Sequence, residues 1–342
     1  MTTLTPHIAR SPRHTTAYLA SGPVDGPLLV FVHGWPELGY SWRHQLRALG
    51  ALGFRCVAPD MRGYGSSTVH PDRTAYRREE AVADMLELLA ALGRSSAIWI
   101  GHDWGGPVVW NIATHHPEAV DAVASLNVPH FPSTGPTPFD LIDRDKYPAD
   151  EYPYGQWDYQ VHYLKAFDEA TAQFESDLPG LIAALFRSGD PRHLDGPAPT
   201  ALVTRNGGWF GGGPVPQLPL DPAVLTPEDH AVYVAAFERN GMAGPNSWYV
   251  NTPADMEYAA TEIDGGRIDK PALFLHGRYD ATLDTVGTRL ADPMRAACTD
   301  LTEVIVDSGH WMGEEKPAEV NAAIAGWIAR SVPGSWPVTL RA

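Results

Sequence analysis

Hydrophobic residues along the first part of the chain form short runs that end in turn residues. Four such runs occupy Leu28–Val32, Arg55–Ala58, Ile98–Ile100 and Val120–Leu126. Because these runs are apolar at every position, they are typical of strands in a sheet that is covered on both faces. Between two of them, apolar residues recur at helical spacing over 82–89. The alternation predicts an α/β fold, a mostly parallel doubly wound sheet with right-handed crossovers.

This pattern stops near residue 129 and returns near residue 265. The intervening segment is rich in proline, glycine and aromatic residues, and Gly207–Pro214 is predicted to be a loop. Its helical pieces are predicted at Tyr159–Phe174, Leu178–Phe186 and Pro227–Asn240. Strand runs then reappear at Ala272–Leu275 and Thr302–Val306, before a final amphipathic helix over 320–328. We therefore expect one core made of residues 1–129 and 265–342, interrupted by a helical cap domain of residues 130–264.

Composition narrows the possible partners and location. The 342 residues include 25 Lys+Arg and 41 Asp+Glu, a net charge of −16. Such a charge repels phosphates and anionic lipid, so neither nucleic acid nor a membrane is an expected partner. No apolar run is long enough to span a membrane, and Met1 to Arg13 lacks a signal pattern, so we expect a cytoplasmic protein. Cys56 and Cys298 are expected to be reduced and buried.

The strongest chemical signal is Gly101-His102-Asp103-Trp104-Gly105-Gly106, which follows a predicted strand and precedes a predicted helix. A nucleophile on a sharp strand-to-helix turn needs small neighbours, which Gly101 and Gly105 supply. Asp103 occupies the centre of this pattern, where serine is more familiar. The alternative interpretation is that Asp103 only caps the following helix.

Two further residues favour catalysis over capping. Asp280 and His310 each follow a predicted strand, and catalytic groups of open α/β sheets gather beyond the carboxyl ends of the strands. The chain order Asp103, Asp280, His310 is that of nucleophile, acid and histidine in an α/β-hydrolase.

The chain resembles the α/β-hydrolase-fold epoxide hydrolases, of the soluble type found in bacteria and animals. The matching core motifs are His33-Gly34-Trp35-Pro36, Arg62-Gly63-Tyr64-Gly65-Ser66-Ser67, the Asp103 motif, and Gly309-His310-Trp311 followed by Glu315–Asn321. Within the expected cap, Trp157-Asp158-Tyr159-Gln160 and Gly241–Asn251 resemble the two tyrosine segments of the family. The resemblance covers nearly the whole chain, and the pair of tyrosine segments is its most specific part.

The resemblance, together with epoxide chemistry, implies a two-step reaction. Asp103 would open the strained ring and form a hydroxyalkyl ester, while Tyr159 and Tyr249 would act as general acids for the departing oxygen. Tyr163 lies one helical turn beyond Tyr159 and is the alternative first tyrosine.

The second step would hydrolyse the ester. His310 would activate a water molecule, and Asp280 would orient the imidazole and stabilise its charged form. The oxyanion would be bound by the backbone N–H groups of Trp35 and Trp104. In the family the peptide before the motif proline is usually cis, which implies a cis Trp35–Pro36 bond.

The substrate pocket is expected to be apolar. Trp35, Trp104, Trp209 and Phe210 are its predicted lining residues. The reaction requires no cofactor, and no metal-binding motif is present. The expected partners are a small epoxide and water, and the chain is expected to act as a monomer or a homodimer.

Two other functions remain open at this point. Haloalkane and haloacid dehalogenases use the same aspartate nucleophile. The former typically have Asn at the position of Trp35, and the fluoroacetate enzymes usually have Arg at that of Trp104. A binding protein or hormone receptor on the same fold, with vestigial catalysis, is a second alternative. The full set of predicted catalytic residues favours an epoxide hydrolase.

Overall fold

The computed structural model describes residues 3–337, so the outermost residues of both expected core segments, 1–2 and 338–342, lie outside it. Its strands are β1 (Thr5–Arg10), β2 (Thr15–Ser21), β3 (Leu28–Val32), β4 (Arg55–Pro59), β5 (Ala97–His102), β6 (Val120–Leu126), β7 (Ala272–Gly277) and β8 (Leu301–Val306). They form one eight-stranded sheet in the order β1-β2-β4-β3-β5-β6-β7-β8. From β4 to β8 neighbouring strands are parallel, as the sequence predicts.

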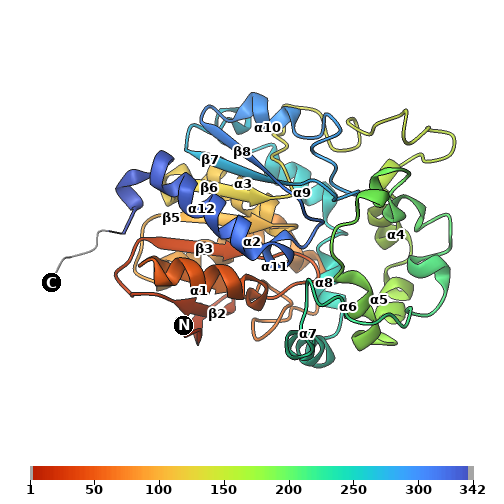
Figure 1. Ribbon diagram of the computed structural model, residues 1–342, viewed down its shortest axis with the longest axis horizontal. Helices are drawn as coiled ribbons and strands as arrows, with labels where there is room; N and C mark the ends of the chain where they lie inside the picture. The colour runs from red at the N-terminus through yellow and green to blue at the C-terminus, as the bar shows by residue number, and fades with distance from the viewer. Residues whose placement is uncertain (1–2, 338–342) are drawn as a thin grey trace.

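Helices cover both faces of this sheet (Figure 1). In the core they are α1 (Arg43–Ala51), α2 (Arg78–Ala91), α3 (Gly105–His115), α10 (Asp292–Ala297), α11 (Met312–Glu315) and α12 (Pro317–Ser331). Side chains of β3 alternate between the two layers: Val30 packs in the cluster of α2 and α3, and Phe31 packs in the cluster of α1 and α12. Because successive residues of a strand point to opposite faces, a wholly apolar run is what this double covering requires.

The segment between β6 and β7 contains helices and no strand of the sheet. Its helices are α4 (Asp158–Lys165), α5 (Phe167–Glu175), α6 (Leu178–Leu185), α7 (Pro227–Asn240), α8 (Ala243–Ser247) and α9 (Thr252–Ala259). Figure 1 shows α4 to α7 gathered at one end of the sheet. Within residues 3–337, no helix combines the length and the apolarity needed to cross a membrane.

Two local features differ from the sequence predictions. The strands β1 and β2 were not predicted; they pair antiparallel at the edge of the sheet, and β1 is almost entirely exposed, so it carries no buried apolar run. The predicted helix Tyr159–Phe174 is two helices, α4 and α5, because Ala166 leaves the helical region at φ −139° and ψ 45°. Acidic residues in the first turn of α5 favour a new helix start there.

Both cysteines are free and buried, which confirms the prediction for Cys56 and Cys298. The glycine-rich loop holds a short 3-10 turn, η7 (Trp209–Gly212), in which Phe210 and Gly211 have positive φ.

Candidate active site

Asp103 lies on a tight turn between β5 and α3. Its φ is +49°, in the left-handed region that non-glycine residues rarely adopt. Glycines make this turn possible, because a Cβ at Gly105 would lie 2.0 Å from the Val32 carbonyl oxygen and one at Gly101 would lie 2.3 Å from the Gly105 oxygen. The side chain of Asp103 does not cap α3, which begins without a side-chain cap. The capping alternative is therefore wrong.

The structure brings Asp103, Asp280 and His310 together. Nδ1 of His310 is 2.7 Å from Oδ2 of Asp280, and Nε2 of His310 is 3.5 Å from Oδ2 of Asp103. The imidazole thus bridges two carboxylates, one from the end of β7 and one from the end of β5. Asp280 is held further by the backbone N–H of Leu283, which donates to its other oxygen at 3.0 Å.

The charges of these three groups depend on one another. Burial by itself raises the pKa of Asp103, but hydrogen bonding to His310 and the His310 charge outweigh it and hold that pKa below its usual value. The pKa of Asp280 is lowered against burial by the same partner. For His310, burial lowers the pKa, yet Asp280 and Asp103 more than compensate and raise it well above its usual value. These directions favour ionised carboxylates on Asp103 and Asp280 and a positively charged His310.

The backbone of Trp35 reaches the other oxygen of Asp103. Its N–H donates to Oδ1 at 2.6 Å, and the Trp35–Pro36 peptide is cis. The preceding Gly34 allows this approach, since a Cβ there would lie 2.4 Å from the Trp104 nitrogen. The predicted oxyanion N–H of Trp35 therefore contacts the Asp103 carboxylate, and that of Trp104 belongs to the residue that directly follows Asp103.

The two predicted tyrosines come from separate helical segments, and their rings meet beside Trp104, the residue that follows Asp103. Tyr159 is on α4 and Tyr249 follows α8, and their ring centroids are 5.6 Å apart at 74°. Burial is the main cause that raises the pKa of both phenols, and the Asp103 carboxylate is the second. Both hydroxyls therefore remain protonated at neutral pH, as proton donors must.

Tyr163 occupies a different position from Tyr159. Its ring stacks on that of Tyr249, with centroids 4.5 Å apart at 13°, and the residue is fully buried. Among the causes that raise the pKa of Tyr163, Asp103 comes last, behind burial and Tyr159. These contacts favour Tyr159 over Tyr163 as the partner of Tyr249 beside Asp103.

The predicted lining residues divide into two groups. Trp104 contacts Tyr249, with centroids 5.1 Å apart, and the Trp209 ring lies 6.0 Å from Trp35 and 5.8 Å from Tyr159. Phe210 lies further out, where it contacts Trp209 and Phe174 at 6.4 Å each. Trp35, Trp104 and Trp209 thus surround the tyrosine pair, and Phe210 stands behind Trp209.

Sequence analysis did not identify Asn127, which supports the histidine loop. Its amide donates to Oδ2 of Asp280 at 2.6 Å and faces the carbonyl oxygens of Gly309 and His310 at 3.4 and 3.3 Å. Its φ is +65°, a conformation that asparagine tolerates better than most residues. Asn127 directly follows β6, so the rule on strand ends that selected Asp280 also applies to it.

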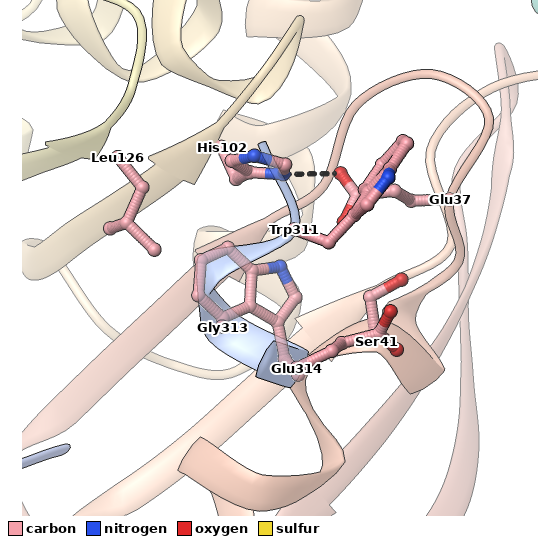
Figure 2. A pocket seen from close by; sticks show the side chains of 8 residues that line it. Glu37, Ser41, His102, Leu126, Trp311, Gly313 and Glu314 are labelled. Atoms are coloured by element: carbon pink, nitrogen blue, oxygen red, sulfur yellow. Dashed lines mark hydrogen bonds and ion pairs between the residues drawn. The ribbon is translucent and has the colours of Figure 1, made fainter. Parts of the chain in front are cut away.

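A second unpredicted contact network lies behind His310. Glu37 accepts from the Gly34 N–H and faces Nδ1 of His102 at 2.8 Å, while Nε2 of His102 donates to the His310 carbonyl oxygen at 2.8 Å. Figure 2 shows this Glu37–His102 contact at the edge of a cavity of about 10 Å³, close to the least space that one water molecule needs. The network joins the turn that carries Trp35 to the loop that carries His310.

Comparisons with known proteins identify the family. Residues 27–172 match the family model described as the alpha/beta hydrolase fold. Epoxide hydrolase A of Mycobacterium tuberculosis is 32% identical over 321 residues, which cover 90% of this chain and 92% of that protein. Bifunctional epoxide hydrolase 2 of Sus scrofa is 35% identical over 305 residues, 89% of this chain and 51% of the relative. The chain thus spans about half the length of the mammalian relatives it matches.

Solved structures agree with the sequence matches. Epoxide hydrolase A from Mycobacterium thermoresistibile superposes with a TM-score of 0.78 at 32% identity, over 96% of this chain and 99% of that one. An epoxide hydrolase from an endophytic Streptomyces superposes with a TM-score of 0.76 at 33% identity, over 95% of both chains. Fold and site therefore define an α/β-hydrolase with a carboxylate at the nucleophile turn. Within that class, the chain belongs to the family of epoxide hydrolases, which confirms the resemblance noted in the sequence.

Proposed function

We propose that this protein hydrolyses epoxides to vicinal diols through a covalent ester on Asp103. The observation that carries this proposal is that Asp103 faces His310 through Oδ2 and accepts from the Trp35 N–H through Oδ1, while the rings of Trp35 and Trp104 contact Tyr249 of the tyrosine pair. An epoxide carbon is electrophilic enough for direct attack by a carboxylate, and the departing oxygen needs the proton donors that the two phenols provide.

In the first step, Oδ2 of Asp103 forms a bond to one epoxide carbon while the bond from that carbon to the ring oxygen breaks. Oδ1 is occupied by the Trp35 N–H, which leaves Oδ2 as the nucleophile. Tyr159 and Tyr249 donate hydrogen bonds to the departing oxygen, and one of them transfers its proton.

In the second step, His310 removes a proton from a water molecule that attacks the ester carbonyl carbon. Esterification removes the negative charge of Asp103, one of the two carboxylates that raise the pKa of His310. The imidazolium is therefore more acidic after the first step. It can pass a proton to the tyrosine that was ionised in that step, and the tyrosine pair is then neutral again. The oxyanion forms on Oδ1 against the N–H groups of Trp35 and Trp104. When it collapses, the bond from the carbonyl carbon to Oδ2 breaks, Oδ2 takes a proton from His310 and leaves in the diol, and the new Asp103 carboxylic acid returns its proton to His310.

Dehalogenation fits the same nucleophile less well. A departing halide needs N–H donors and no proton, whereas the two phenols suit an oxygen leaving group that takes up a proton. The indole N–H of Trp35 is already engaged, since it donates to Oδ1 of Asn246 at 3.0 Å. The experiment that tests the proposal measures diol release from styrene oxide and halide release from 1-bromobutane by the same preparation. Diol without halide is the expected result, and halide without diol would overturn the proposal.

We further propose that residues 130–264 act as the cap that carries Tyr159 and Tyr249 over a core made of residues 1–129 and 265–342. The proposed partners are a small epoxide and water, without nucleic acid or membrane. The proposed location is the cytoplasm, because cysteines stay reduced there and both cysteines of this chain are free. The proposed assembly is a monomer or a homodimer, which analytical ultracentrifugation distinguishes.

A further inference from the structure

Glu315 accepts hydrogen bonds from two backbone segments that lie far apart in the sequence. The Gly309 N–H donates to Oε2 of Glu315 at 2.8 Å, and the Gly189 N–H donates to the same oxygen at 3.0 Å. Gly309 directly precedes His310, whereas Gly189 lies shortly after the end of α6. One carboxylate oxygen therefore joins the loop of the proposed base to residues 130–264, the proposed cap.

Glycine at both positions allows the two backbones to touch. A Cβ at Gly189 would lie 2.2 Å from the Gly309 nitrogen, and one at Gly309 would lie 2.7 Å from the Gly189 Cα atom. A larger residue at either position would therefore separate the two segments and move at least one N–H away from Glu315.

The short helix α11 brings Glu315 back to the residue before the histidine. It begins at Met312, and the Glu315 N–H donates to the Trp311 carbonyl oxygen at 2.8 Å. This single turn reverses the chain directly after His310, so the Glu315 side chain reaches Gly309. The loop that carries the histidine is thus closed by Glu315.

A second contact with the same segment follows the histidine. The Trp311 ring stacks on Phe186, with centroids 4.2 Å apart at 15°, and its indole N–H donates to the Leu185 carbonyl oxygen at 2.7 Å. His310 therefore lies between two contacts with residues 185–189, one through Gly309 and one through Trp311.

These contacts gain importance in the second step of the proposed reaction. Before that step, Nε2 of His310 faces the Asp103 carboxylate at 3.5 Å, but the ester no longer carries the charge that attracts the imidazole. The backbone of the histidine loop must then keep the ring in place for the attacking water. Displacement of a reacting group by about 1 Å can lower a rate by ~10²-fold.

We propose that Glu315 is a positioning residue for ester hydrolysis, which holds His310 through Gly309 and makes this step depend on the position of residues 185–189. The inference rests on the proposed epoxide hydrolysis and adds a coupling between the proposed cap and the base. Ring opening uses Asp103 and the tyrosine pair, so it does not require this contact.

Rapid-quench measurement of single turnovers with styrene oxide separates formation of the ester from its hydrolysis. We expect Glu315→Ala to slow hydrolysis by roughly 10- to 100-fold and to leave ester formation close to the wild-type rate, so that the ester accumulates. Glu315→Gln keeps an oxygen that can accept both N–H groups and should recover most of the lost rate.

Gly189→Ala tests the same contact from the side of the proposed cap. Its methyl group would separate residues 189 and 309 while Glu315 is retained, so we expect the same selective slowing of hydrolysis. Glu319→Ala is the matched control, because it removes an exposed carboxylate from the first turn of α12 and should change neither step.

Hydrolysis at the wild-type rate in either Glu315→Ala or Gly189→Ala, or equal slowing of both steps, would overturn the role of Glu315. If Glu315→Ala does not fold, Gly189→Ala decides by the same criterion. A wild-type enzyme that forms neither ester nor diol would instead overturn the proposed function.

Discussion

The backbone N–H of Trp35 lies 2.6 Å from Oδ1 of Asp103 and so makes the two carboxylate oxygens inequivalent. The bound oxygen is placed to become the oxyanion, and the other faces His310. Attack by Oδ2 followed by water attack on the ester carbonyl carbon transfers Oδ2 to the diol. The oxygen of water then replaces Oδ2 in the carboxylate.

Isotope labelling follows directly from this assignment. In a single turnover in H₂¹⁸O with enzyme in excess, we expect unlabelled diol and one ¹⁸O in the peptide that carries Asp103. Mass spectrometry of the diol and of the digested protein measures both. Labelled diol with an unlabelled peptide would mean that water attacks the epoxide directly, and Asp103 would then not be the nucleophile.

Replacement of the histidine separates the two steps. His310→Gln should still allow ring opening, because that step uses Asp103 and the phenols, but the ester should persist because no base remains. Intact-protein mass spectrometry should find a gain of one substrate mass. Asp103→Asn is the control that should gain none, since an amide is a poor nucleophile, and an adduct in that variant would contradict the mechanism.

The tyrosine pair should control ring opening. Tyr159→Phe and Tyr249→Phe should each slow single-turnover alkylation, and the double variant should approach loss, since general acid assistance typically contributes ~10²–10⁴-fold. Tyr163→Phe serves as the comparison, because Tyr163 is the alternative first tyrosine and its ring stacks on that of Tyr249. If it slows alkylation of a purely hydrocarbon epoxide as much as Tyr159→Phe does, the assignment of the first tyrosine is wrong.

The two steps should depend differently on pH. The pKa of Asp103 lies below its usual value and those of Tyr159 and Tyr249 lie well above theirs, so alkylation should be constant between about pH 6 and 9. Ester hydrolysis requires neutral His310 and should slow as the pH falls. Stopped-flow measurement of both phases checks this, and alkylation that rises with pH in step with hydrolysis would contradict it.

The proposed catalytic residues were easier to predict from the sequence than the residues that support them. Asp103, Asp280 and His310 stand out because each lies within four residues of the end of a strand that the sequence predicts, and parallel strands bring such residues together. Asn127 has the same position after β6, but an asparagine there is equally common as a turn residue, and only its contact with Asp280 distinguishes it. The exposed strand β1 had no apolar signal, because its stability comes from pairing with β2.

The contacts made by residues 130–264, the proposed cap, could not be predicted from the sequence either. The link from the Trp35 indole through Asn246 to Thr171 joins three segments whose approach depends on the path of irregular loops. The Gly207–Pro214 segment was predicted to be a loop, yet glycine allows so many conformations that the position of Trp209 could not follow from it.

Asn127 offers a test of support for the histidine. Its amide donates to the ionised Asp280, and a hydrogen bond to a charged group contributes about 1.5–3 kcal/mol, so Asn127→Gly should slow ester hydrolysis by roughly 10- to 100-fold. Glycine accepts the positive φ, so the backbone is preserved. Alkylation, which does not use His310 as a base, should change little. Equal slowing of both steps in rapid-quench experiments would indicate a general disturbance instead.

The last prediction concerns Glu314, a buried acid between the core and α7. Tyr233 of α7 donates to its Oε1 at 2.7 Å, Arg43 of α1 pairs with the same oxygen, and Oε2 lacks a partner among the described residues. Burial raises the pKa of Glu314 to about 7, against the opposing effect of Arg43. The folded protein therefore binds the Glu314 proton more tightly than the unfolded chain does. The stabilisation that results is fully present below the usual glutamate pKa and is lost as the pH rises through about 7.

Glu314→Gln removes this proton equilibrium while it keeps the size of the side chain. The wild type should gain more stability from pH 8 to pH 5 than the variant does, by about 3 kcal/mol in unfolding free energy. Urea denaturation of both proteins at the two pH values measures this. The exposed Glu118→Gln controls for a general change in charge, since its side chain is 75% exposed. A pH dependence that matches the wild type would mean that Glu314 is ionised throughout. In that case the pair with Arg43, and not a protonated acid, would join α7 to the core.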